Sequence, residues 1–298
     1  MLQKTHLRRN LFICGFLLVP LGLYVLFSIW PLIRLVQFSF TSWNGVDTSQ
    51  PYIGLANYEE IFFRTPQVWA ALKNNLIYFL VECVGLGLSM LLATILVSKI
   101  RGSKFFRTVL FAPYAINVTA IALMFVAIYH SQTGALNSLL KAVGLEVLTQ
   151  KWISDPNIVN YSLAFVVLWK AFGYYMVLDI AAIMSVPTDL YEAAAIDGAN
   201  AWQKFRSITF PSIKSIVSLE FFLIFAGSWQ RYLEPYIMTG EGGPGNSSVT
   251  FALYSLRTAF RFKRYGFACA MAVIMIVVIL LARLLPALGV RILKKRED

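Results

Sequence analysis

Long apolar stretches alternate with short polar connections along this chain of 298 residues. A helix of about 20 apolar residues crosses the ~30 Å hydrocarbon core of a bilayer, and six stretches reach that length. They cover approximately residues 11–33, 73–97, 108–130, 159–184, 212–238 and 266–290. The pattern predicts an all-α membrane protein, a polytopic bundle of six transmembrane helices that forms a single domain over residues 1–298.

Composition supports a membrane protein independently of this pattern. Hydrophobic residues make up 58% of the chain and charged residues 14%, which is too little polar surface to cover a soluble globule of this size. The formal net charge of +11 does not indicate nucleic-acid binding, because the charges flank the apolar stretches. Anionic lipid headgroups are the expected partners of these charges.

The distribution of Lys and Arg predicts the orientation of the bundle. Short cytoplasmic connections carry an excess of both residues. Three basic groups follow this rule: Lys4, Arg8 and Arg9; Lys99, Arg101, Lys104 and Arg107; and Arg291, Lys294, Lys295 and Arg296. Both termini are therefore expected inside. A fourth group lies on the predicted outer side, and the rule does not account for it: Arg257, Arg261, Lys263 and Arg264.

Residues 187–211, between the fourth and fifth stretches, are rich in small and charged residues and are here called the coupling segment. Thr188 is suited to capping a first short helix, because its hydroxyl can accept a hydrogen bond from an unpaired backbone N–H. Gly198 allows a sharp turn. A second short helix, from about residue 199 to 209, is expected to end at Pro211, whose ring clashes with a continuing helical turn. The predicted orientation places this segment in the cytoplasm.

The order of residues in the coupling segment resembles the EAA loop of the transmembrane subunits of binding-protein-dependent ABC importers. The matching residues are Glu192, Ala193, Ala194, Asp197, Gly198, Ala199, Ile208 and Pro211. In that family the loop forms helices that lie in a groove of a cytoplasmic ATPase. The resemblance implies that Glu192, Ala193, Ala194, Asp197 and Gly198 couple this chain to such an ATPase. Small alanine side chains permit close approach of the partner, and Glu192 offers it a charge.

The resemblance extends to the sugar-importing branch of these permeases. Its motifs are GLANYEEIF at 54–62, FRTVLFAPY at 106–114, GALNSLL at 134–140 and TGEGGPG at 239–245. It implies a subunit in a prokaryotic plasma membrane that pairs with a homologous second permease, most simply as a heterodimer. Two cytoplasmic ATPase subunits and an extracytoplasmic solute-binding protein complete the implied assembly. Asp179 departs from the family pattern, which usually has an apolar residue at that position.

Charged side chains inside a membrane are costly and mark candidate sites. Five fall within the predicted spans: Glu82, Lys170, Asp179, Glu220 and Arg231. Lys170 and Asp179 point to opposite sides of one helix, whereas Glu220 or Arg231 could pair with Lys170 or Glu82 across helices. A carboxylate beside aromatic rings suits a sugar. The candidate substrate pathway therefore consists of Phe172, Tyr175, Asp179, Glu220, Trp229 and Gln230.

The predicted outer loops carry helix-start signals. Asn57 followed by Glu60 forms a capping-box pattern. Thr65 before Pro66 is expected to cap a helix that continues into the second span, and Asp155 before Pro156 repeats this start ahead of the fourth span.

The sequence offers no set of catalytic residues. It lacks a phosphate-binding loop with Lys, a nucleophile beside a base, and any metal-ligand spacing. The three cysteines, Cys14, Cys83 and Cys269, lie at different predicted depths, and packing is their expected role. The chain is therefore predicted to be a transport subunit that binds no cofactor, with ATP and Mg²⁺ used by the partner ATPase.

Two other functions remain open at this stage. A glycerol-phosphate importer of the same architecture would need cationic groups in its pathway, and Lys170 and Arg231 are the mid-span candidates. An ion-coupled secondary transporter, a different class, would use Asp179 or Glu220 as a proton or cation site.

Overall fold

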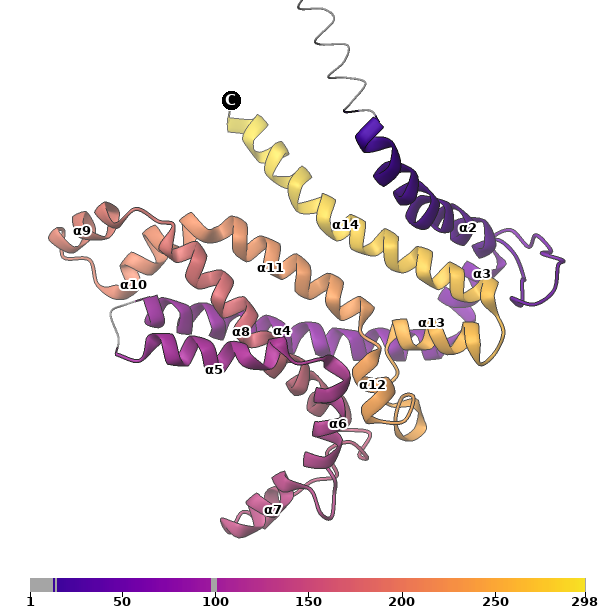
Figure 1. Cartoon of the computed structure of the whole chain (residues 1–298), viewed down its shortest axis with the longest axis horizontal. Coiled ribbons are helices and arrows are strands. Elements are labelled where there is room, and N and C mark those ends of the chain that lie inside the picture. Colours follow the sequence, from indigo (N-terminus) through magenta and orange to yellow (C-terminus); the bar gives the residue numbers. More distant parts are fainter. Residues whose placement is uncertain (1–12, 14, 98–100, 298) are drawn as a thin grey trace, which may run out of the picture. The chain divides into compact units, whose positions relative to one another are not determined.

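A computed structural model describes residues 13, 15–97 and 101–297, and these residues are helical throughout apart from turns, loops and one isolated β-bridge between Thr41 and Tyr52 (Figure 1). The helices before the fourth predicted span are η1 (Val25–Ile29), α2 (Trp30–Ser39), α3 (Ala56–Glu59), η2 (Glu60–Arg64), α4 (Pro66–Val97), α5 (Ser103–Ala115), α6 (Val118–Ile128), α7 (Ala135–Ala142) and η3 (Glu146–Leu148). Those that follow are α8 (Val159–Met184), α9 (Thr188–Ile196), α10 (Ala201–Lys204), η4 (Phe205–Thr209), α11 (Phe210–Gln230), α12 (Leu233–Met238), η5 (Pro244–Asn246), α13 (Phe251–Phe260) and α14 (Tyr265–Glu297).

The chain divides into two compact units. Among the described residues, the smaller unit comprises 13–65 and 255–277, and the larger unit comprises 66–254 and 278–297. The prediction of a single domain is not tested by this division. Several residues used in the sequence prediction lie outside the described residues: Lys4, Arg8, Arg9, Cys14 and Lys99.

Five described helices are long and apolar enough to cross a membrane: Gly15–Ser39, Pro66–Val97, Val159–Met184, Ala201–Gln230 and Tyr265–Leu284. A bent pair, Ser103–Ala115 with Val118–Ile128, supplies a sixth candidate. The prediction of an all-α polytopic membrane protein is therefore confirmed. The first span runs to Ser39, six residues beyond the predicted end at residue 33, and the added residues include the polar Arg34 and Gln37.

The third predicted span, 108–130, is not one straight helix. α5 and α6 meet at a bend of 98°. Pro113 lies in the last turn of α5, and Ile116 is extended, with ψ 140°. Asn117 then begins a new helix, because its side chain accepts a hydrogen bond from the backbone N–H of Thr119 at 2.8 Å. Proline and a good capping residue close together thus end one helix and start another inside an apolar stretch.

The fifth predicted span, 212–238, has different limits. α10, η4 and α11 form one continuous helix over Ala201–Gln230, so the second coupling helix does not end at Pro211. The π-helical turn η4 ends two residues before the proline, and such a wider turn relieves the clash that would otherwise end the helix. At the far end the helix stops at Gln230, Arg231 is extended, and α12 follows as a separate short helix.

The smaller unit shows why two outer-loop signals were misinterpreted. Asn57 lies inside α3 rather than capping it, and its amide donates to the backbone oxygens of Ser39 and Thr41 at 2.8 and 2.9 Å. Glu60 accepts two hydrogen bonds from Arg264, at 2.6 and 2.8 Å. These bonds lower the pKa of Glu60 below its ordinary value, against a smaller opposing effect of burial. Arg264 of the unexplained basic group therefore has a defined partner.

α4, α8 and α11 form the centre of the larger unit, with α5 packed against α8. α9 and α10 lie at the end of this unit where α4 ends and α5 begins, and α6, α7 and α12 lie at the opposite end (Figure 1). The coupling segment and the first turns of α5, which carry Lys104 and Arg107, thus share one end of the unit, as the predicted orientation requires. α4 begins at Pro66 as predicted. α8 has the limits predicted for the fourth span, but its N-cap residue is Ile158, so the helix start expected at Asp155 and Pro156 is wrong.

Gly173 allows α8 to approach the backbone of α5 closely. A Cβ atom at this position would collide with the backbone oxygen of Leu110 in α5. We expect Gly173→Ala to destabilise the protein by about 1–3 kcal/mol, because backbone atoms cannot move aside without separating α5 from α8. Gly87→Ala is the matched control, since nothing lies within 4 Å of the added atom in α4. Thermal unfolding in detergent measures both, and equal melting temperatures would contradict the expectation.

Candidate functional site

A cavity of about 470 Å³ opens in the larger unit, where α4, α8, α11 and α12 meet the junction of α5 and α6. Its walls combine four charged residues, four tyrosines and a glutamine with apolar side chains. The polar and aromatic lining residues are Glu82, Tyr114, Lys170, Tyr174, Tyr175, Gln230, Arg231, Tyr232 and Glu234. The break between α11 and α12 positions three of these side chains, Gln230, Arg231 and Glu234, at the cavity.

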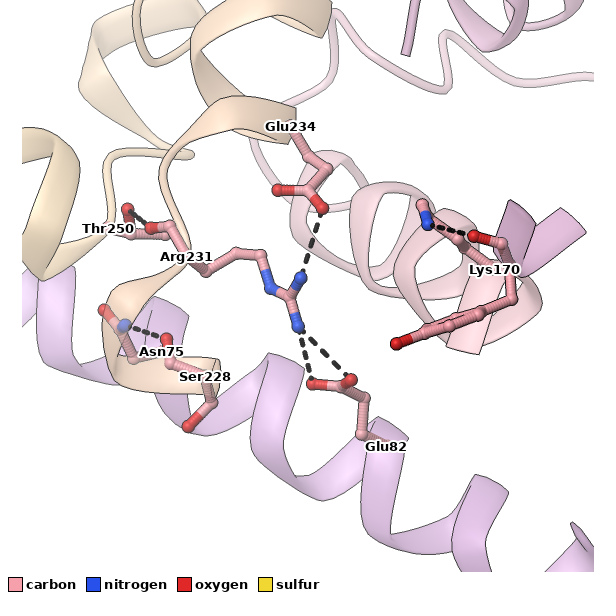
Figure 2. Close-up of polar contacts among 8 residues, drawn as sticks. Asn75, Glu82, Lys170, Ser228, Arg231, Glu234 and Thr250 are labelled. Atoms are coloured by element: carbon pink, nitrogen blue, oxygen red, sulfur yellow. Dashed lines mark hydrogen bonds and ion pairs between the residues drawn. The ribbon is translucent and has the colours of Figure 1, made fainter. Parts of the chain in front are cut away.

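Arg231 joins two carboxylates across the cavity wall (Figure 2). Its guanidinium lies 3.2 Å from a carboxylate oxygen of Glu82 on α4 and 3.2 Å from one of Glu234 on α12. Both glutamates are buried, with exposed fractions of 1% and 4%. A lone buried charge is very costly, so each carboxylate depends on the arginine. The pairing of Arg231 with Glu82 that the sequence left open is therefore the one that forms.

Lys170 and an aromatic stack form the facing wall. Tyr114 and Tyr174 stack with ring centroids 4.5 Å apart and planes inclined by 15°. The Lys170 Nζ donates to the backbone oxygen of Tyr114 at 3.0 Å and lies 4.9 Å from its ring centroid. Unlike Arg231, Lys170 makes no ion pair among those found in the described residues. The formal charges of the four charged side chains that line the cavity, two acidic and two basic, sum to zero.

Buried side-chain amides of α4 and α8 hold a glycine-rich loop at 239–250 against these two helices. Asn74 on α4 donates to the backbone oxygens of Ser247 and Val249, both at 2.8 Å, and Asn160 on α8 donates to Ser247 at 2.9 Å. Thr250 donates to the backbone oxygen of Arg231. The TGEGGPG motif and the Arg231 network thus form one connected structure.

The structure separates the predicted pathway residues into three groups. Tyr175 and Gln230 line the cavity. Trp229 lines a different, apolar pocket beside Phe79, and Phe172 is half-buried outside the cavity lining. Asp179 and Glu220 are completely buried and do not line the cavity. Contact of these residues with a substrate stays a prediction.

The coupling segment has the two-helix form that the sequence predicted, with differences at its caps. Pro187, not Thr188, is the N-cap residue of α9, and no side chain caps this helix. Gly198 makes the turn with φ +78°, and Asn200 with Gln203 forms a capping box at the start of α10. A hydrogen bond of 2.9 Å between the hydroxyls of Tyr191 and Thr209 ties the two helices together.

The face that the segment presents includes residues the sequence did not single out. Glu192, Ala193, Asp197 and Gly198 are exposed, and Ala194 is half-buried. Ile196 and Trp202 are 87% and 62% exposed beside them. Isolated exposed apolar residues are common, but here they adjoin the predicted coupling residues. Ile196 and Trp202 could have been identified from the sequence, because they are large apolar residues in a loop that was predicted to be polar.

Other functional residues were also missed. Glu234 lay within the predicted fifth span and was not counted among the buried charges, although its carboxylate pairs with Arg231. Asn74, Asn75 and Asn160 anchor the glycine-rich loop and the end of α11. Three amides within apolar helices were the signal that could have found them, because buried polar groups require partners.

Known proteins resemble the chain over most of its length. A family model described as "Binding-protein-dependent transport system inner membrane component" matches residues 85–296. The probable ABC transporter permease protein YurN of Bacillus subtilis (strain 168) is 38% identical over 88% of this chain and 90% of that protein. The diacetylchitobiose uptake system permease protein NgcF of Streptomyces coelicolor is 31% identical over 93% of this chain and 82% of its own length.

A solved structure shares the fold. One chain in the crystal structure of a bacterial alginate ABC transporter, in complex with an alginate pentasaccharide-bound periplasmic protein, superposes with a TM-score of 0.81 at 24% identity, covering 94% of each chain. The resemblance inferred from the coupling segment and the TGEGGPG motif is confirmed, and so is a transport subunit rather than an enzyme. The chain belongs to the family of inner-membrane components of binding-protein-dependent transport systems, as a multi-pass permease subunit of an ABC importer.

Proposed function

We propose that this chain forms half of the translocation pathway for a carbohydrate, an oligosaccharide, and that the cavity between α8 and the break at Arg231 is part of that pathway. A homologous second permease supplies the other half. An extracytoplasmic solute-binding protein delivers the sugar, and two cytoplasmic ATPase subunits dock on the coupling segment, hydrolyse ATP with Mg²⁺ and drive the change of access.

The observation that carries the proposal is the chemistry of the cavity. The Tyr114–Tyr174 stack offers an aromatic face to the C–H side of a sugar ring. Charged and amide groups from Lys170, Gln230 and the Arg231 network surround it, and charged groups make strong hydrogen bonds with hydroxyls. The named diacetylchitobiose relative supports a saccharide substrate.

The two alternative functions are less well supported. A phosphate ester needs uncompensated positive charge, but Arg231 already pairs with Glu82 and Glu234. Lys170 alone would face a doubly charged phosphate. An ion-coupled secondary transporter does not agree with membership in an ABC importer family.

Uptake of labelled oligosaccharides by cells that carry only variant forms of this chain tests the proposal. We expect Tyr174→Ala to raise KM about tenfold, the change that corresponds to the loss of a stacking contact worth ~1.4 kcal/mol. Tyr161→Ala is the matched control, because Tyr161 lines a separate apolar pocket. Equal effects of the two substitutions would count against the cavity as the pathway.

Lys170→Met separates sugar from phosphate-ester transport in the same assay. Removal of the positive charge is expected to leave neutral-sugar uptake within a few-fold of the parent, because hydroxyls also bind the carboxylates and amide that remain. Loss of all uptake of neutral sugars, with retained assembly, would contradict this assignment. Loss restricted to sugar phosphates would favour the alternative substrate class.

A further inference from the structure

Two carboxyl groups face each other inside the larger unit, away from the cavity. Asp179 extends from α8 and Glu220 from α11, and their side chains lie within hydrogen-bonding reach of one another. Both residues have an exposed fraction of 0%. Ser89 on α4 donates its hydroxyl to one Asp179 oxygen at 3.2 Å. Three helices thus converge on a pair of acids in an otherwise apolar region.

The pair lacks the partners that buried carboxylates normally have. The remaining oxygen of Asp179 and both oxygens of Glu220 make no hydrogen bond with a donor in the described structure. The titratable or charged group that faces Glu220 from α8 is Tyr175, whereas α4 contributes the neutral Ser89. Among the ion pairs of the described residues, none includes Asp179 or Glu220. Glu82 and Arg231 pair with each other instead.

This arrangement cannot hold two negative charges. Burial of one unpaired carboxylate is already expensive, and a second like charge within contact distance adds repulsion in a medium of low dielectric constant. One proton placed between the two groups leaves a single negative charge in place of two, which removes the repulsion, and it forms a hydrogen bond that joins one oxygen of Asp179 to one oxygen of Glu220. We propose that Asp179 and Glu220 share a proton and form a protonated joint between α8 and α11.

The location of the joint gives it a role in conformational change. α8 ends at Met184 and leads into the coupling segment, and α11 continues the helix in which the coupling segment ends. The joint therefore ties together the two helices that flank this segment. When the shared proton leaves to water, two carboxylates remain, and their repulsion favours separation of α8 from α11. The transport consequence rests on the proposed function, whereas the protonation of the pair does not.

Chemical labelling of the purified complex tests the proton directly. A hydrophobic carbodiimide such as dicyclohexylcarbodiimide adds to a protonated carboxyl group, with the carboxyl proton moving to the reagent nitrogen as the acyl–oxygen adduct forms. We expect adducts on Asp179 or Glu220 in peptide mass spectra, fewer as the pH rises. Glu82 is the internal control, because it is equally buried but paired with Arg231, and it should remain unlabelled. Labelling of Glu82 to the same extent would overturn the proposal.

Stability measurements give a second, independent readout. A carboxyl that keeps its proton in the fold but loses it near pH 4 when unfolded makes the fold less stable as the pH rises. The melting temperature of the parent complex should therefore fall more steeply than that of Asp179→Asn or Glu220→Gln as the pH rises from about 4, where the unfolded carboxyl groups lose their protons, to the pH at which the shared proton leaves the fold. In each variant an amide donor replaces the shared proton. The exposed Glu146→Gln serves as the control and should retain the parent slope.

The outcomes separate this inference from the proposed function. Parallel pH profiles for the parent and both amide variants, together with no label at either acid, would show that the pair shares no proton. If the label and the slopes behave as expected but no oligosaccharide uptake is found, the joint stands and the substrate assignment fails. If uptake is found and Asp179→Asn transports without the alkaline loss of the parent, the joint also regulates transport.

Discussion

Arg231→Met is expected to abolish transport and to destabilise the protein by about 3–5 kcal/mol, because the substitution leaves Glu82 and Glu234 buried without a cation. The same substitution removes the side chain that joins α4 to the short helix α12. Uptake assays and thermal unfolding of the purified complex measure the two effects separately. A variant that unfolds at the parent temperature would show that the two glutamates do not depend on Arg231.

Compensating substitutions distinguish lost charge balance from lost shape. Glu82→Gln with Glu234→Gln, introduced into the Arg231→Met background, should recover most of the lost stability because no unpaired charge remains. Transport should stay low if the cavity needs the charged network itself. Lys170→Met is the control for removal of a cavity cation, since Lys170 makes none of the observed ion pairs in the described residues and its loss should leave the melting temperature nearly unchanged.

Helices whose mainly apolar sequence lies between polar turns were predictable. α8 has the limits predicted for the fourth span, because polar turns bound its mainly apolar stretch at both ends. The bend between α5 and α6 was not predicted, because Pro113 and Asn117 lie within an apolar stretch whose composition does not change. Pro211 gave the opposite error. A helix end was predicted there, but the wide turn before the proline lets the helix continue. Composition predicts burial in a membrane, whereas local hydrogen bonding determines where a helix breaks.

The candidate site shows a similar division. The sequence identified Glu82 and Arg231 as buried charges and left their pairing open, because 149 positions separate them in the chain. Asp179 and Tyr175 were both assigned to the candidate substrate pathway, but Tyr175 lines the cavity whereas Asp179 is buried beside Glu220 of α11. Helix rotation depends on contacts among several helices, and the periodicity of one helix does not specify it.

Gly198→Arg is expected to remove the ATPase from the purified complex while the permease itself remains folded. Gly198 has φ +78°, which costs a residue with a side chain about 1–2 kcal/mol. Nothing lies within 4 Å of an added Cβ atom, so the side chain enters open space without disturbing the packing of the chain. Gly198 directly follows Ile196 and Asp197, which are exposed on the face proposed to contact the ATPase. A long cation there should prevent close approach of the partner.

Gly144→Arg is a closely matched control for this substitution. Gly144 also has a left-handed backbone, with φ +77°, and open space around an added side chain, but it lies in the loop after α7. Strain and added charge are therefore the same in both variants, and only the location differs. Affinity purification with mass spectrometry should recover an ATPase and a second permease with the parent and with Gly144→Arg. With Gly198→Arg the second permease should remain and the ATPase should be lost. Retention of the ATPase by both variants would place the docking surface elsewhere, because an arginine at the turn of the coupling segment cannot fit a closely packed interface.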